Sequence, residues 1–433
     1  MSQLITRLES LENEIRIGII GIGSIGTGMV YQGYLTPGMD CVAVCDIQIE
    51  RATSCLDWMG REYEIVSSHK SMNEAIEQGK VAVTADGQLL ASCDLLDVCI
   101  EATNTIVEGG HHAEMAINAG KHAIMMNYEA DLIFGSYLFN LAKEKGVVYT
   151  SADGDQPTVV KRLIDYVQFM GFELVMAGNI KGYLDRYANP TMIVPEADKR
   201  NLDYRMCTSY TDGTKLCIEM SVLANGLGLR TEVPGMLGPR IDHVLDIFDV
   251  INFEDVWDGK QAIVDFVLGA QPTGGVFVVG YTDKVYQQET LAWFPPKLGP
   301  GPFYIFYRPF HLGHFETMLG VAEAALDGYG VLQPHAGFQT NVYSYAKSDL
   351  HRGDTLDGIG GYTCYGLIEN CDEDIHKPGI PICLADDMIL KRDIPQDEKI
   401  FLDDVEFDPN TNKWVLYNKA LEQSSLVRHS FAE

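Results

Sequence analysis

A glycine-rich turn directly after an apolar run constrains this chain more than any other feature. The run 17–20 leads into the pattern G-x-G-x-x-G, which is formed by Gly21, Ile22, Gly23, Ser24, Ile25 and Gly26. In dinucleotide-binding βαβ units, the first glycine permits the tight turn and the second lets the backbone approach a pyrophosphate. The third lets the next helix pack closely on the strand, and the N-terminus of that helix suits an anion. The pattern therefore predicts a dinucleotide-binding turn.

A second apolar run supports this interpretation. Residues 41–45 read as a strand that ends at Asp46, about 20 residues beyond the last glycine. An acidic side chain at this place accepts hydrogen bonds from the ribose hydroxyls of NAD and repels a 2′-phosphate. NAD(H) is therefore the favoured cofactor, and Arg51 nearby keeps NADP(H) open. The alternative is an α/β domain whose glycine turn holds no nucleotide.

Composition narrows the class of protein. The chain has 433 residues, enough for two or three domains, and a formal net charge of −29, which argues against a nucleic-acid partner. No stretch approaches the roughly 20 apolar residues of a membrane span, so we expect a cytoplasmic protein with no membrane partner. The ten cysteines include no C-x-x-C pair and suit buried, reduced thiols.

Alternating strands and helices continue after Asp46. The expected strands are 94–101, 121–127 and 147–151, and the expected helices are 109–119 and 131–145. This rhythm predicts an α/β fold with a doubly wound parallel sheet of the Rossmann type. Ligands collect at the carboxyl ends of such strands. We therefore expect one crevice to be lined by Ala102, Thr103, Asn127, Asp153 and Asp155.

The pattern changes beyond this sheet, and we expect three domains: 1–157 for the dinucleotide, 158–334 as an α+β substrate domain, and 335–433 as a small β-rich domain. In the second, a helix 158–170 and a strand 173–177 precede a loop with Lys181. Segments 215–220 and 275–280 read as strands, and 314–326 as a helix. Past about Pro334 the chain reads as short β segments with little helical periodicity.

Several segments resemble a known family. Residues 120–127 and 141–149 resemble the end of the nucleotide domain of homoserine dehydrogenase. Nearly the whole chain resembles the homoserine-dehydrogenase-like oxidoreductases with a C-terminal SAF domain. That likeness is carried by 127–131, 153–157, 235–240, 307–312 and 356–362, and the SAF β-clip by 346–350, 353–356 and 391–394. The resemblance implies an NAD(P)-dependent oxidoreductase that forms a homodimer.

Two departures bear on the reaction. One branch of the family resembles 1-deoxy-D-xylulose 5-phosphate reductoisomerase, with NADPH, a divalent metal and a lysine-rich loop; here that loop reads Asn179-Ile180-Lys181-Gly182. Homoserine dehydrogenase has an Asn-Lys pair at its active site, and here Tyr128 follows Asn127. Homoserine dehydrogenase activity is therefore not expected, and the reductoisomerase-like reaction is an alternative.

Hydride transfer to a carbonyl needs a proton donor, and Lys181 is the candidate, since burial lowers a lysine pKa toward neutrality. Its other interpretation is a solvated loop lysine. Asp153 and Asp155 could hold a divalent metal, orient Lys181 or hydrogen-bond substrate hydroxyls; alternatively they form an ordinary turn in which Asp155 caps the helix that Pro157 opens. Glu219 lies in an apolar segment, where a carboxylate is either a buried site residue or a solvent-facing one. Whether a divalent metal is required stays open.

A small-molecule substrate needs anchoring groups. Arg240 and Arg308 are candidates for holding a phosphate or carboxylate, or they form structural ion pairs, and Asn225 offers an amide. His311, His314 and Glu316 are a less favoured metal-binding set. These residues suggest an oxidoreductase that interconverts a hydroxyl and a carbonyl on a small, polyhydroxylated, anionic compound. The alternatives are the reductoisomerase-like reaction and a nucleotide sensor without turnover.

Overall fold

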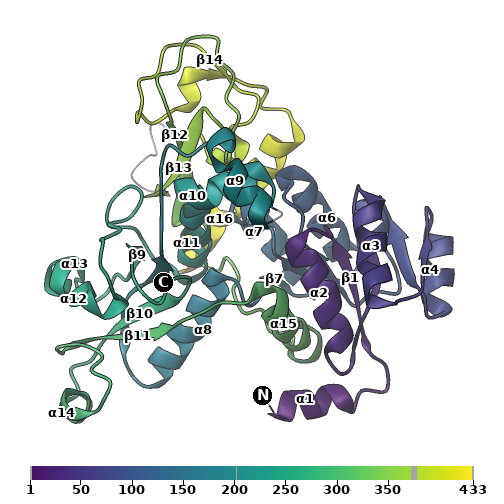
Figure 1. Ribbon diagram of the computed structural model, residues 1–433, viewed down its shortest axis with the longest axis horizontal. Helices are drawn as coiled ribbons and strands as arrows, with labels where there is room; N and C mark the ends of the chain where they lie inside the picture. The colour runs from purple at the N-terminus through teal and green to yellow at the C-terminus, as the bar shows by residue number, and fades with distance from the viewer. Residues whose placement is uncertain (1, 201, 372–377, 432–433) are drawn as a thin grey trace. The chain divides into compact units, whose positions relative to one another are not determined.

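The structure, a computed structural model, describes residues 2–200, 202–371 and 378–431 (Figure 1). The chain forms two compact units. The first comprises Met1–Asp155, Leu312–Gln333 and Leu416–Gln423, and the second comprises Gln156–His311, Pro334–Val415 and Ser424–Glu433. The three domains expected from the sequence are consecutive segments, and that division stays a prediction.

The first unit contains a seven-stranded parallel sheet with the order β3-β4-β2-β1-β5-β6-β7. Its strands are β1 (Ile15–Ile20), β2 (Met39–Cys45), β3 (Tyr63–Ile65), β4 (Val81–Thr84), β5 (Val98–Glu101), β6 (His122–Met125) and β7 (Tyr149–Ser151). The strand order reverses between β1 and β5, which is where ligands bind in open α/β sheets. The predicted doubly wound sheet and α/β fold class are confirmed.

Helices cover both faces of this sheet, shown mostly in purple and blue in Figure 1. They are α1 (Ser2–Glu9), α2 (Ser24–Leu35), α3 (Ile49–Met59), α4 (His69–Glu77), α5 (Gly87–Ala91), α6 (Ile106–Asn118), α7 (Tyr128–Lys145) and α15 (Gly313–Asp327). One core joins Ile17 and Ile19 of β1 to α2, α3 and α15, and a second joins Ile20 to α4 and α5. Because both faces are buried, the central strands β1, β2, β4 and β5 are mostly apolar rather than alternating.

The second unit contains a four-stranded sheet with the order β11-β10-β8-β9. Strand β8 pairs in parallel with β9 and antiparallel with β10. The strands are β8 (Glu173–Lys181), β9 (Ile263–Leu268), β10 (Val276–Tyr281) and β11 (Phe303–Arg308). The helices are α8 (Gln156–Phe169), α9 (Pro190–Arg200), α10 (Tyr204–Asp212), α11 (Thr214–Leu227), α12 (Ile247–Val250), α13 (Phe253–Val256) and α14 (Val285–Trp293), with the 3-10 helix η1 (Val244–Asp246).

The C-terminal part of this unit holds two small antiparallel sheets. They are formed by β12 (Thr340–Ala346) with β13 (Cys364–Asn370), and by β14 (Ile389–Leu390) with β15 (Val405–Glu406). In sequence, the 3-10 helix η3 (Ile382–Leu384) lies between β13 and β14, and η4 (Leu402–Asp404) lies between β14 and β15. Helix α16 (Asn412–Phe431) follows. This region is rich in short β segments, as expected, and its assignment as a SAF domain stays a prediction.

Two elements differ from the sequence-based expectation. Segment 215–220 is part of helix α11, not a strand, and every residue from Thr214 to Gly226 is buried. A helix buried on all sides has no polar face, so its 3.6-residue period is lost and short apolar runs imitate a strand. The helix α16 was also not expected. Its buried residues are few and lie among many polar neighbours, which makes a weak helical signal: Trp414, Leu416, Tyr417, Ala420 and Ser424.

Candidate functional site

The glycine turn of the first unit has the geometry that its three glycines predict. Gly21 has a φ of +97°, and a Cβ there would lie 2.7 Å from the backbone of Ala102 and Thr103. A Cβ on Gly26 would lie 1.9 Å from the carbonyl oxygen of Gly21. At Gly23, by contrast, nothing within the described residues lies within 4 Å of a built Cβ. Gly21 and Gly26 therefore shape the turn, while Gly23 leaves open the place that a phosphate would approach.

The turn leads into α2, of which Ser24 and Ile25 are the first residues. Asp46 holds this turn from the end of β2. It is 8% exposed, and its Oδ2 accepts a hydrogen bond from the Ile22 N–H at 2.9 Å, while Oδ1 accepts one from the Gln48 N–H at 2.8 Å. The carboxylate expected to bind a ribose thus also fixes the backbone of the nucleotide turn.

A buried polar network follows β5 at the same edge of the sheet. Glu101 accepts hydrogen bonds from Thr103, and its Oε2 lies 2.8 Å from Nδ1 of His112. Asn127 caps α7 through a hydrogen bond from the Ala130 N–H, and its amide nitrogen donates to the Thr105 carbonyl. Sequence reasoning singled out Thr103 and Asn127 but missed Glu101 and His112. An acid at the end of an apolar strand was the available signal.

The Asp-Gly-Asp turn is packed against α15. The Thr317 hydroxyl donates to the Asp153 carbonyl oxygen at 3.0 Å, and Asp153 Oδ1 accepts a hydrogen bond from the Gly154 N–H. Gly154 has a φ of +88°, and a Cβ there would lie 2.4 Å from Cβ of Glu316. Asp153 is buried and Asp155 is partly exposed. The described part of the chain contains no group of three or more His, Cys, Asp or Glu side chains able to hold a metal ion.

In the second unit, strand register places several predicted site residues on one face of the sheet. Asn179 and Lys181 are two residues apart on β8, so their side chains point to the same face. Val276 of β10 pairs with Asn179 on one side and with Arg308 of β11 on the other, which puts Arg308 on that face too. Lys181 is the last residue of β8 rather than part of a loop.

Helix α11 brings Glu219 to the same face. Glu219 is 2% exposed, and the Asn179 amide nitrogen lies 3.4 Å from its Oε2. Gln156, at the start of α8, donates its amide nitrogen to both carboxylate oxygens of Glu219 when its amide is oriented to satisfy both groups. Oδ1 of the fully buried Asn179 has no hydrogen-bond partner among the described residues. Sequence analysis proposed Glu219 as a catalytic residue, and the structure adds Asn179 and Gln156 beside it.

The remaining candidates for substrate binding lie in different surroundings. Arg240 is exposed, and it follows a loop that Asp265 fixes by accepting hydrogen bonds from the Leu237 and Gly238 N–H groups. Burial raises the pKa of Asp265 to about 6. The Arg308 guanidinium lies 4.5 Å from the ring centroid of Phe310.

Asn225 is buried on α11, and its Oδ1 accepts hydrogen bonds from the Gln339 and Thr340 N–H groups at 2.8 and 2.9 Å. These contacts hold the start of β12. The substrate-binding roles expected for Arg240, Arg308 and Asn225 stay predictions.

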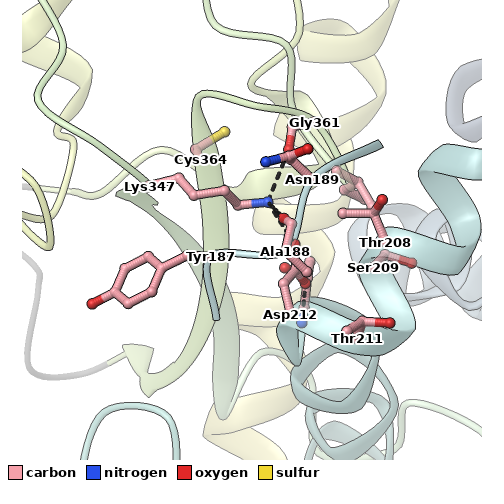
Figure 2. A network of polar contacts seen from close by, with 12 residues as sticks. Tyr187, Ala188, Asn189, Thr208, Ser209, Thr211, Asp212, Lys347, Gly361 and Cys364 are labelled. Atoms are coloured by element: carbon pink, nitrogen blue, oxygen red, sulfur yellow. Dashed lines mark hydrogen bonds and ion pairs between the residues drawn. The ribbon is translucent and has the colours of Figure 1, made fainter. Parts of the chain in front are cut away.

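A buried lysine that the sequence analysis left unassigned lies in the C-terminal part of this unit (Figure 2). Lys347 Nζ donates to Asp212 Oδ2 at 2.9 Å and to the carbonyl oxygens of Ala188 and Gly361 at 2.8 Å. The side chains of Lys347 and Asp212 are 3% and 0% exposed. Burial raises the pKa of Asp212, and Lys347 opposes that shift. Every N–H of this ammonium group has an acceptor, which is typical of a structural ion pair.

Comparison with known proteins gives a family-model match to part of the chain and several structures with limited similarity. Residues 154–317 match the family model described as oxidoreductase DRL, catalytic domain. A comparison with curated protein sequences finds no significant match. No helix in the described residues is both long enough and apolar enough to span a bilayer.

Three solved structures illustrate the similarity. A homoserine dehydrogenase from Thiobacillus denitrificans has a TM-score of 0.47 and 14% identity, over 78% of this chain and 84% of that one. A probable dehydrogenase from Thermotoga maritima has a TM-score of 0.42 and 12% identity, over 73% of this chain and 90% of that one. A DOX-P reductoisomerase in complex with magnesium has 0.35 and 13%, over 49% of this chain and 57% of the other, so this chain spans little more than half its length.

The chain is therefore an oxidoreductase of the NAD(P)-dependent type. The match to an oxidoreductase catalytic domain gives the reaction class. The doubly wound sheet with its glycine turn gives the nucleotide-binding fold. The predicted enzyme class is confirmed.

Proposed function

We propose that this oxidoreductase interconverts a hydroxyl and a carbonyl group on a small, polyhydroxylated, anionic substrate, with NAD(H) as the favoured cofactor. The observation that carries the proposal is the glycine turn, in which Gly21 and Gly26 are crowded by backbone and Gly23 faces open space. A turn of this shape at the switch point of a doubly wound sheet suits a pyrophosphate.

The residues of the first unit fit a dinucleotide. The glycine turn and the N–H groups at Ser24 and Ile25 would hold the pyrophosphate, and Asp46 would accept hydrogen bonds from the ribose. Both Asp46 oxygens already accept one backbone N–H each, and a carboxylate oxygen has a second lone pair. Ala102, Thr103 and Asn127 would line the nicotinamide end. The bound cofactor would supply or accept the hydride.

Lys181 is proposed to move the proton. It is partly exposed at the end of β8, and its Nζ has no hydrogen-bond or ion-pair partner among the described residues. An ammonium group with unused donors can give a proton to an alkoxide and take it back in the reverse direction. Asp153 and Asp155 are proposed to bind substrate hydroxyls, and no step is assigned to a metal.

The polar face of the second unit supports a hydroxyl-bearing substrate. Asn179 Oδ1 is a buried acceptor without a hydrogen-bond donor among the described residues, whereas the neighbouring carboxylate of Glu219 already accepts from Gln156. Such an acceptor suits a ligand with an O–H donor, since leaving a buried acceptor unpaired costs about 1–3 kcal/mol. An anionic group would be repelled there, and Arg308 on the same face or Arg240 would receive it instead.

The first experiment is a fluorescence titration of the full-length protein with NADH and NADPH, on wild type and on Asp46→Asn. The asparagine keeps an acceptor for one backbone N–H and removes the charge. Tight NADH binding, with a preference over NADPH that the substitution reduces, supports the ribose role of Asp46. A wild-type preference for NADPH overturns that role and favours the reductoisomerase-like alternative, whose turnover would stop on chelation of divalent metal. Absence of binding to either nucleotide overturns the proposal.

A further inference from the structure

The carboxylate of Glu101 lies at the end of β5, and both of its oxygens form hydrogen bonds within the protein. The residue is 1% exposed. Its Oε1 accepts hydrogen bonds from the N–H of Thr103 at 2.9 Å and from the hydroxyl of the same residue. Its Oε2 lies 2.8 Å from Nδ1 of His112, which is 9% exposed on α6. The buried carboxylate of Glu101 therefore connects Thr103, in the segment after β5, to His112 on helix α6.

The far end of the same segment is held by Asn127. The hydroxyls of Thr103 and Thr105 lie 2.9 Å apart, and the Thr105 N–H donates to the Thr103 hydroxyl. The Thr105 carbonyl accepts a hydrogen bond from the Asn127 amide nitrogen at 2.8 Å. The segment 102–105, here called the β5 loop, is thus fixed at both ends by buried side chains.

Two glycines make room for these side chains. A Cβ on Gly87 would lie 2.3 Å from Nε2 of His112. A Cβ on Gly109 would lie 2.5 Å from Nδ2 of Asn127 and 3.2 Å from Oε1 of Glu101. Any larger residue at either position would push the network apart. The two glycines therefore leave the space that the side chains of Glu101, His112 and Asn127 occupy.

The β5 loop and the nucleotide turn form one surface. The N–H of Ala102 donates to the carbonyl of Ile20 at 2.8 Å, and a Cβ on Gly21 would lie 2.7 Å from the backbone of Ala102 and Thr103. A shift of the loop by a fraction of an ångström would therefore change the turn on which the pyrophosphate is proposed to rest.

We propose that Glu101 and His112 are positioning residues, which hold the β5 loop in the conformation that receives the dinucleotide. The inference rests on the proposed nucleotide binding by the same turn. A loop that occupies its competent conformation only part of the time weakens the apparent affinity by that fraction. Loss of this buried anchor lowers the fraction of time that the β5 loop spends in the binding conformation, so we expect the NADH dissociation constant to rise by about tenfold or more.

The test compares three variants of the full-length protein by NADH fluorescence titration and thermal unfolding. Glu101→Leu removes both acceptors. Glu101→Gln keeps an amide oxygen for Thr103 and should recover most of the wild-type affinity. Asp131→Asn is the matched control, because Asp131 is a buried acid of the same unit whose partners, Tyr149 and Ser151, lie outside the β5 loop.

We expect Glu101→Leu to bind NADH about tenfold more weakly or worse, Glu101→Gln to recover, and Asp131→Asn to bind like wild type even where it unfolds at a lower temperature. If Glu101→Leu does not fold, His112→Phe removes the other half of the anchor and should give the same loss. Wild-type affinity in the folded variant overturns the inference while the proposed function stands. If wild type itself does not bind NADH or NADPH, the proposed function fails first.

Discussion

Two lysines of the second unit show opposite uses of the same side chain. Lys347 is buried and donates to three acceptors, one of them the carboxylate of Asp212 (Figure 2). Lys181 is a partly exposed residue at the end of β8, and its Nζ has no hydrogen-bond or ion-pair partner in the described part of the chain. A lysine whose donors are all taken has nothing left to offer a ligand. The difference separates the structural lysine from the candidate for proton transfer.

Buried acceptors repeat this contrast. In the first unit, each oxygen of Asp131 accepts a hydroxyl hydrogen bond at 2.6 Å, one from Tyr149 and one from Ser151. In the second unit, Oδ1 of Asn179 has no partner among the described residues. Buried polar groups in proteins are nearly always paired, so an unpaired one calls for an explanation such as a ligand. For these four side chains, the comparison predicts that the paired ones, Lys347 and Asp131, govern stability and that the unpaired ones, Lys181 and Asn179, govern activity.

The largest effect is expected for Lys181→Ala. A positioned proton donor contributes about 10²–10⁴-fold to rate, so turnover should fall by that factor, while the unfolding temperature stays close to wild type because no partner is lost. The measurement is NADH oxidation or NAD⁺ reduction on a panel of polyols and sugar acids. Lys284→Ala is the control, since that lysine is 65% exposed and pairs with its neighbour Asp283. Unchanged turnover in Lys181→Ala would remove the lysine from the mechanism.

Lys347→Met should act on stability instead. It leaves the carboxylate of Asp212 buried without its cation, which typically costs about 3–5 kcal/mol. Urea unfolding followed by circular dichroism measures the loss. The double variant Lys347→Met/Asp212→Asn should be more stable than the single one, because the asparagine carries no charge and still accepts the hydrogen bond from the Thr214 N–H. A single variant as stable as wild type would contradict the structural role.

The sequence predicted the first unit well because its signals are local. A strand, a glycine turn and an acid at a fixed distance specify the nucleotide fold with no information about distant segments. Glu101 and His112 lie only 11 residues apart, yet they were missed, because a pair of this kind becomes meaningful only when β5 and α6 are known to pack together.

The second unit was harder to predict because its signals are not local. Asn179 and Glu219 are 40 residues apart, and their contact depends on α11 being a helix, which was not recognised because the helix is buried on all sides and shows no regular polar face. Lys347 and Asp212 are 135 residues apart, and no periodicity connects them. The register that places Arg308 level with Asn179 also depends on the pairing of three strands. Such juxtapositions follow from tertiary structure and cannot be read from spacing.

A smaller effect is expected for the pH dependence of stability. Burial raises the pKa of Asp131 in the folded protein from 3.8 to about 6, against the hydrogen bonds from Ser151 and Tyr149. A folded pKa above the unfolded value means that the stabilising contribution is complete below about pH 4 and is lost as the pH rises through 6. This group should lower the free energy of unfolding by up to roughly 3 kcal/mol over that interval. Asp131→Asn should flatten that part of the profile, measured by urea unfolding at pH 4, 5, 6 and 7. A slope identical to wild type would show that Asp131 is already ionised at pH 4.

The smallest change in stability is expected for Asn179→Leu. This variant best distinguishes a side chain that binds substrate from one that stabilises the fold. Because Oδ1 of Asn179 is unpaired and its amide lies 3.4 Å from Glu219, little is lost on replacing it by an apolar side chain of similar volume, and we expect a change within about 1 kcal/mol. If Oδ1 accepts a substrate hydroxyl, KM for a hydroxylated substrate should rise about tenfold, whereas the dissociation constant for NADH, which is proposed to bind the first unit, should not change.

Asn179→Asp supplies a second comparison, because a carboxylate beside Glu219 adds like charge and should destabilise the fold where leucine does not. A large loss of stability in Asn179→Leu with unchanged KM would place Asn179 with Lys347 and Asp131, among the groups that hold the structure together.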